Sequence, residues 1–83
     1  MTTEIFPGIT VDTQVIHGKP AIRGTRIPVA LVLGQLAGGA TYEELEREYG
    51  LATEQVQAAL GYAAQLVASE TIYAVATDGV TGE

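Results

Sequence analysis

The chain has 83 residues and no cysteine, and its four Lys and Arg against ten Asp and Glu give a formal net charge of −6. This length fits one domain, the 47% of hydrophobic residues excludes a disordered chain, and the lack of cysteine excludes disulfides and cysteine-bound metals. The acidic balance argues against general nucleic-acid binding, because neutralisation of phosphates by Lys and Arg supplies that affinity.

The N-terminal third predicts extended structure. Short β-prone runs at 9–11 and 15–16 are separated by Gly8 and by polar residues, and the run 20–23 predicts a second short strand before a turn at Gly24–Thr25. We therefore expect residues 1–27 to form a β-arm. Its unpaired edge would invite strand exchange with a second copy of the chain.

Two helices are predicted next. The first runs from Pro28, a residue suited to the first helical position, to residue 37, and Gly38–Gly39 ends it. The second has Thr41 as its N-cap and Glu44 three residues later, which is the pattern of a capping box. Gly50 closes it, and its apolar residues (Tyr42, Leu45 and Tyr49) share one face.

A third helix is predicted from Thr53 as N-cap to Ser69. Its apolar stripe consists of Val56, Leu60, Ala63 and Val67, and beside it lies a line of small residues suited to a second helix, namely Ala58, Gly61, Ala64 and Ala68. Residues 70–77 fit a strand or a longer helix. The predicted fold is mainly α: a β-arm (1–27), a three-helix helix-turn-helix domain (28–69) and a tail (70–83). The small core and the line of small residues favour a homodimer.

Positive charge is concentrated in one segment. Lys19, Arg23 and Arg26 stand within GKPAIRGTRIP, and only Arg47 lies elsewhere. Three interpretations stay open: ion pairs of the arginines with Glu43, Glu46 or a terminus, contact with an acidic partner, or contact with DNA phosphates. A P-loop is excluded, because position 13 is Thr and Pro20 follows the lysine.

Three blocks of the sequence together resemble one known family. HGKPAIRGTRIPV, LAGGATYEEL and EYGLATEQVQAALGYA are similar to the bacterial and archaeal family called domain of unknown function 433, over roughly residues 9–66. The resemblance implies a homeodomain-like or winged-helix-like domain. It also implies a VapB-type antitoxin whose partner is a PIN-like ribonuclease. In two respects the chain departs from the family: the third helix has no Lys or Arg, and the tail is longer and more apolar.

On this resemblance we expect the protein to bind the acidic metal site of such a toxin. The contacts assigned to the partner are Lys19, Arg23 and Arg26, with a second contact from the tail at Ile72, Tyr73 and Val75. An arginine placed among the toxin's acidic side chains would displace its metal ion.

The main alternative is a DNA-binding regulator. It would read bases with Thr53, Gln55 and Gln57 and hold phosphates with Lys19, Arg23 and Arg26. A further alternative is a structural domain with neither role. His17 is expected in a turn, and we expect no cofactor, no metal site and no enzymatic activity. The lack of a signal peptide or membrane span predicts a cytoplasmic protein.

Overall fold

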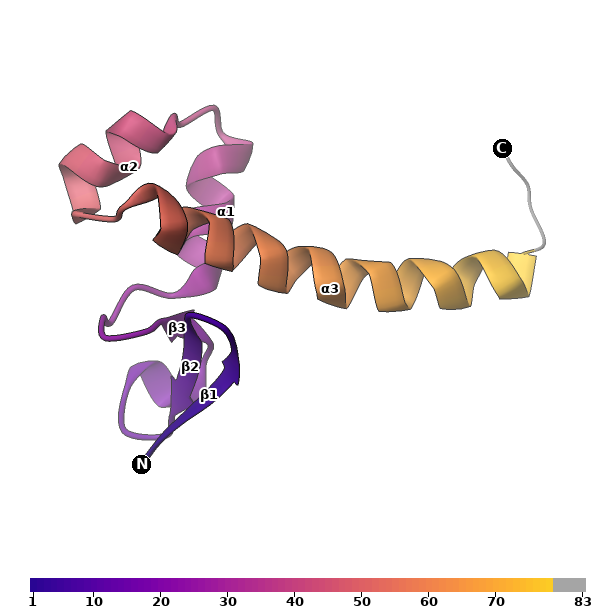
Figure 1. The fold of residues 1–83 in the computed structure, drawn as a ribbon. Coiled ribbons are helices and arrows are strands. Elements are labelled where there is room, and N and C mark those ends of the chain that lie inside the picture. Colours follow the sequence, from indigo (N-terminus) through magenta and orange to yellow (C-terminus); the bar gives the residue numbers. More distant parts are fainter. Residues whose placement is uncertain (79–83) are drawn as a thin grey trace.

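The protein combines a small sheet with three helices (Figure 1). The computed structural model describes the backbone of residues 1–78 and the side chains of residues 1–69. In chain order the elements are β1 (Thr2–Phe6), β2 (Ile9–Asp12), the 3-10 turn η1 (Ile16–Gly18), β3 (Ala21–Ile22), α1 (Val29–Ala37), α2 (Tyr42–Tyr49) and α3 (Thr53–Asp78).

The prediction of a mainly α domain with a β-arm is wrong, because the arm folds into a sheet of its own. The three strands are antiparallel in the order β1-β2-β3, which makes the fold mixed α/β. Pro7 and Gly8, with Gly8 at φ +86°, form the turn that folds β1 back on β2 and pairs Phe6 with Ile9. A type II turn requires positive φ at its third residue and commonly has proline at its second, which matches Pro7–Gly8.

The basic segment forms a second, tighter hairpin. The backbone N–H of Ile22 donates to the carbonyl of Ile27 at 3.0 Å, and Ala21 is bridged to Pro28. At the tip, the Thr25 hydroxyl donates to the Ile22 carbonyl at 2.8 Å and accepts from the Ile27 N–H at 3.0 Å. Residues 23–26 are therefore a fixed turn, and the strands of the arm pair within this chain.

The predicted ends of the first two helices are confirmed within one residue. Pro28 is the N-cap of α1, and beyond its C-cap the chain passes through Gly39 at φ +100°. Thr41 and Glu44 form the capping box of α2 through hydrogen bonds of 3.0 and 2.9 Å. Gly50 ends α2 in the left-handed conformation.

The third helix takes the longer of the two alternatives left open for residues 70–77, and it packs differently from the prediction. It continues through 70–77 to Asp78, and its far end projects well away from the other elements (Figure 1). In the predicted apolar stripe Val56 is buried and Ala63 is half-buried, whereas Leu60 and Val67 are exposed. Ala59, outside the predicted stripe, is buried. None of the helices in the described residues combines the length and apolarity needed to cross a bilayer.

The line of small residues on α3 packs against the sheet. A Cβ built on Gly8 would lie 2.9 Å from the Cβ of Ala58, and a Cβ on Gly61 would lie 3.3 Å from the ring of Phe6. The rings of Phe6 and Tyr62 are 5.8 Å apart. Two of the four small residues thus accommodate this chain's own hairpin rather than a second helix.

A single core joins the sheet to the helices, and α3 contacts α1, α2, β2 and β3. Its largest fully buried side chains come from every layer of the fold: Ile9, Ile22, Val32, Leu45, Leu51 and Val56. Because the hairpins are anchored in this core, the charged side chains around them are held on a rigid base.

Candidate partner-binding site

The three clustered cations line two different pockets. Arg23, at the start of the hairpin tip, lies 3.4 Å from Glu4 of β1, in an exposed ion pair with the two side chains 65% and 42% exposed. Among the described side chains, neither arginine forms the ion pair with Glu43 or Glu46 that one interpretation expected, and Arg23 pairs with Glu4 instead. In the part of the chain that the structure describes, neither Lys19 nor Arg26 has a carboxylate within ion-pair distance.

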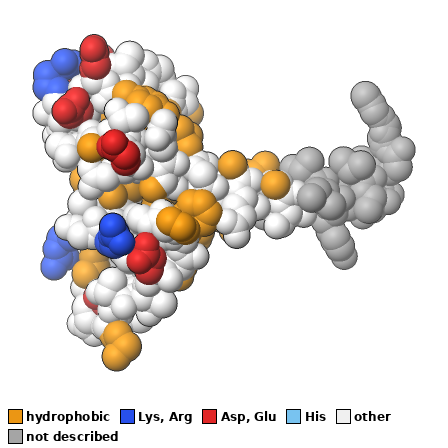
Figure 2. Space-filling view, in the orientation of Figure 1, with side chains coloured by type: hydrophobic (Ala, Val, Ile, Leu, Met, Phe, Trp, Pro, Cys, Tyr) orange, Lys and Arg blue, Asp and Glu red, His pale blue; other side chains and the backbone are white. Residues whose placement is uncertain are grey.

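Lys19 and Arg26 instead share a cleft of about 320 Å³ beside the sheet. We call this the Lys19–Arg26 cleft, and its other lining residues are Thr2, Thr10, Asp12, Val15, Ala21, Gly24 and Thr25. Figure 2 shows that Lys and Arg side chains on the visible face lie over the sheet-bearing part of the molecule and at the outer end of the helical part. The cleft concentrates two positive charges within an acidic protein.

Lys19 follows a strained turn, Ile16–Gly18, that positions it at the cleft. Ile16, His17 and Gly18 have φ values of 51°, 56° and 79°, and hydrogen bonds of 3.1 Å from the N–H groups of Gly18 and Lys19 close the turn. The prediction that His17 lies in a turn is confirmed. Positive φ disfavours non-glycine residues, and a β-branched residue such as Ile16 most of all. Strain of this kind persists only where the surrounding structure imposes it, and it is concentrated at functional sites.

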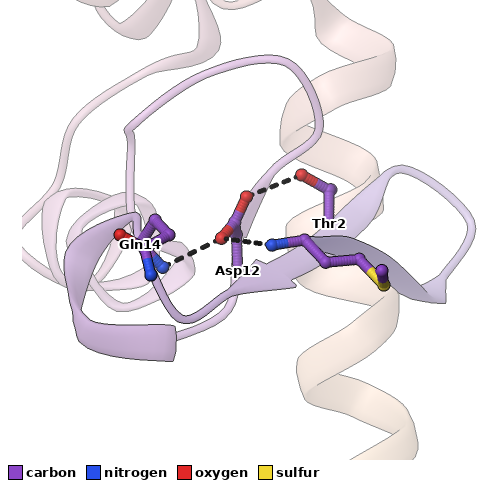
Figure 3. Close-up of polar contacts among 4 residues, drawn as sticks. Thr2, Asp12 and Gln14 are labelled. Carbon is purple, nitrogen blue, oxygen red and sulfur yellow. Dashed lines mark hydrogen bonds and ion pairs between the residues drawn. The ribbon is translucent and has the colours of Figure 1, made fainter.

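Among the described residues, Asp12 is the one carboxylate that lines the cleft, and the protein already satisfies its oxygens (Figure 3). The N–H of Gln14 donates to Oδ1 at 2.9 Å, and the Thr2 hydroxyl donates to Oδ2 at 2.8 Å. The Met1 ammonium lies 3.3 Å from Oδ1. The N–H of Gln14 above all, then the Thr2 hydroxyl, hold the pKa of Asp12 below its ordinary value, because they stabilise the charged form.

We expect Asp12 to make stability pH-dependent. Because its pKa is lowered on folding, its contribution is present above the ordinary value of 3.8 and disappears as the pH falls through the lower folded value. Urea unfolding should show Asp12→Asn less stable than the wild type at pH 7, with the difference shrinking below pH 4. A difference that stays constant down to acidic pH would contradict this.

The residues proposed to read DNA are divided between two surfaces. Gln55 is committed to capping α3, since its Oε1 accepts from the N–H of Ala52 at 2.7 Å; the N-cap is therefore Ala52 and not Thr53. Arg23 lines a pocket with Glu54 and Gln55, whereas Lys19 and Arg26 line the other cleft. Thr53 and Gln57 are exposed. The structure does not support DNA reading, because it does not assemble these residues into one basic surface.

The predicted apolar contact lies on the projecting part of α3. The side chains of Ile72, Tyr73 and Val75 lie outside the described residues. Before them on the same helix, Leu66 and Val67 are exposed, and Leu66 lines an apolar groove with Val29, Leu33 and Tyr62. This groove is separate from the Lys19–Arg26 cleft except at Lys19, which lines both. The homodimer stays a prediction.

Sequence similarity identifies the family. Residues 9–63 match the family described as "Protein of unknown function (DUF433)". The chain belongs to this family. The resemblance inferred from the sequence is thereby confirmed, and the matched residues run from β2 through the tighter hairpin to the first part of α3, without β1.

Two proteins of Mycobacterium tuberculosis are similar to this chain. The uncharacterized protein Rv2308 is 32% identical over 57 residues, which are 69% of this chain and 24% of that protein. A protein named "Putative antitoxin VapB45" is 35% identical over 52 residues, which are 63% of this chain and 22% of that protein. This chain thus matches about a quarter of the length of these curated relatives.

Two crystal structures share the fold. A DUF433 member from Anabaena variabilis has a TM-score of 0.65 and 37% identity, over 70% of this chain and 58% of that one. Rv2018 from Mycobacterium tuberculosis has a TM-score of 0.57 and 35% identity, over 63% of this chain and 24% of that one. At these identities, the fold of the family is the mixed α/β fold found here.

Proposed function

We propose that this protein is a non-enzymatic, antitoxin-type binding protein that neutralises a PIN-like ribonuclease by direct contact. Membership of the DUF433 family and the similarity to a protein named as an antitoxin support this proposal. The toxin class comes from the family resemblance, in which such domains accompany PIN-like ribonucleases.

The observation that carries the proposal is the placement of Lys19 and Arg26. Both line one cleft, and neither has an ion-pair partner among the described side chains. Because the body of the protein is acidic, this cleft is where an acidic surface can approach with favourable electrostatics. PIN-like ribonucleases have such a surface at their metal site. Arg23 is a weaker candidate for contact with the ribonuclease, because Glu4 already offsets its charge.

The projecting part of α3 supplies a second surface for the same partner. Leu66 and Val67 are 49% and 57% exposed, in a stretch where residues 64–69 are all exposed. A helix that projects without packing gains little stability by itself, because most helical stability in proteins comes from tertiary contacts. A partner that covers this face would bury apolar area that the isolated chain leaves in water.

Co-purification tests the function. The chain is expressed with the product of the neighbouring gene, and the complex is isolated through a tag on the ribonuclease. We expect Arg26→Ala to weaken the complex by about 30-fold or more, the size of an interface hot spot, and to restore RNA cleavage. Arg47→Ala is the matched control, because Arg47 lies on α2 outside the cleft.

Two results would reject the proposal. One is the absence of any complex with a PIN-like ribonuclease. The other is a complex that forms but leaves RNA cleavage unchanged. Equal losses from Arg26→Ala and Arg47→Ala would leave the function standing and reject the placement of the contact.

A further inference from the structure

The Lys19–Arg26 cleft brings two cationic side chains to one concave surface. Its two cations come from different segments, Lys19 from the end of the strained turn and Arg26 from the end of the hairpin tip. They line a concave space of about 320 Å³ rather than a projecting ridge. A bound group would therefore lie inside this concave surface rather than on a protruding part of the protein.

A largely buried threonine, Thr10, also lines the cleft. It belongs to β2 and is only 7% exposed. Among the described residues the Thr10 side chain has no hydrogen-bond partner. The described part of the chain also contains no side-chain nitrogen or oxygen atom that is fully buried and lacks a hydrogen bond. The Thr10 oxygen is therefore not sealed off from the surface of the protein. A polar group at this depth that lacks a partner gains from a ligand that accepts its hydrogen bond.

The rigidity of the cleft is built into the backbone. Gly24, at φ +78°, turns the chain between Arg23 and Arg26, and a Cβ at this position would meet no heavy atom within 4 Å. The Thr25 hydroxyl holds both arms of that turn through its two hydrogen bonds. The cleft is thus formed before any ligand arrives, which reduces the entropy lost on binding.

We propose that the cleft binds the carboxylate of an aspartate or glutamate side chain presented by the partner protein, with Lys19, Arg26 and the Thr10 hydroxyl as its contacts. A guanidinium group matches a carboxylate through paired N–H donors, and the ammonium adds a second charge. Asp12 is not itself the carboxylate that Lys19 and Arg26 bind, because Gln14 and Thr2 already donate to its oxygens. The choice of an acidic protein as the source rests on the proposed function.

Titration of the isolated full-length chain with a short peptide tests this. The probe is acetyl-Gly-Asp-Asp-Gly-amide, its control is the same peptide with asparagines, and the backbone amide NMR signals of Ala21, Gly24 and Thr25 are followed at low salt. We expect saturable shifts with the acidic peptide alone. Lys19→Gln or Arg26→Gln should weaken binding about tenfold or more, which matches the loss of a charge-assisted hydrogen bond.

Two further variants separate this site from general charge attraction. Arg23→Gln removes an equal charge outside the cleft and should change the affinity less than about twofold. Thr10→Val removes the hydroxyl and should weaken binding several-fold, with unchanged amide signals at Val32 and Leu45 showing that the fold is intact.

The proposal is overturned if the acidic peptide gives no saturable shift or binds no better than the asparagine peptide. It is also overturned if Arg23→Gln weakens binding as much as Arg26→Gln, or if inorganic phosphate binds the same amides more tightly. Peptide binding that persists while the ribonuclease fails to co-purify would reject the proposed function alone. Co-purification without peptide binding would reject the carboxylate site alone.

Discussion

Replacing Leu51 by alanine should destabilise the protein by about 2–5 kcal/mol, the range for removing a buried leucine side chain. Leu51 is 1% exposed and lies in the core between the sheet and the helices. It stands in the turn between α2 and α3, so its replacement does not change the helix propensity of either one. Small domains have about 5–15 kcal/mol of stability in total, and this variant therefore loses a large share.

Urea unfolding monitored by circular dichroism measures this loss, and Leu60→Ala is the matched control. Leu60 is 37% exposed and lies outside the core cluster, so its replacement should cost clearly less than that of Leu51. Equal losses in the two variants would mean that Leu51 is not a core residue. The melting temperature of Leu51→Ala should fall by about 4–8 °C for each kcal/mol lost.

Helix ends could be predicted from the sequence because their signals are local. Thr41 and Glu44 bond to each other's backbone N–H groups, and Gly50 adopts a conformation that other residues resist. At the start of α3 the same logic failed by one residue. There the side chain of Gln55 bonds the N–H of Ala52, and alanine gives no capping signal in a sequence.

The sheet was missed although part of its signal was present. Pro7–Gly8 is flanked by β-prone residues, which is a hairpin signal, but the segment was interpreted as an arm with a free edge. The tighter hairpin depends on contacts between Ile22 and Ile27 and on the hydroxyl of Thr25. These strand pairings are decided by the core that the strands share with α3. The spacing of residues in the sequence carries no information about that core.

The three cations are neighbours in the sequence, but in the fold they line two different pockets. Gly24 reverses the chain between Arg23 and Arg26, so that one arginine meets Glu4 and the other joins Lys19. Thr10 was not predicted as a site residue. A signal for it existed in the alternation of β2, where Thr10 and Asp12 lie two residues apart and line the same cleft.

Replacing Gly8 by alanine should destabilise the protein by about 2–4 kcal/mol for two separate reasons. At φ +86° any side chain is strained, and the new Cβ would lie 2.9 Å from the Cβ of Ala58 on α3. Gly8 cannot easily move away. Its carbonyl accepts from the N–H of Arg23, and its N–H donates to Glu4, both at 2.8 Å. The variant would therefore push the β1–β2 hairpin away from α3.

The control Gly24→Ala separates the two causes. Gly24 has a similar φ of +78°, but a Cβ there meets no heavy atom within 4 Å. It should therefore show only the conformational part of the loss, about 1–2 kcal/mol. Adding Ala58→Gly to Gly8→Ala should recover the contact part, after allowance for the roughly 1 kcal/mol that glycine costs inside a helix. If urea unfolding gives equal losses for Gly8→Ala and Gly24→Ala, the close packing of the hairpin on α3 does not constrain position 8.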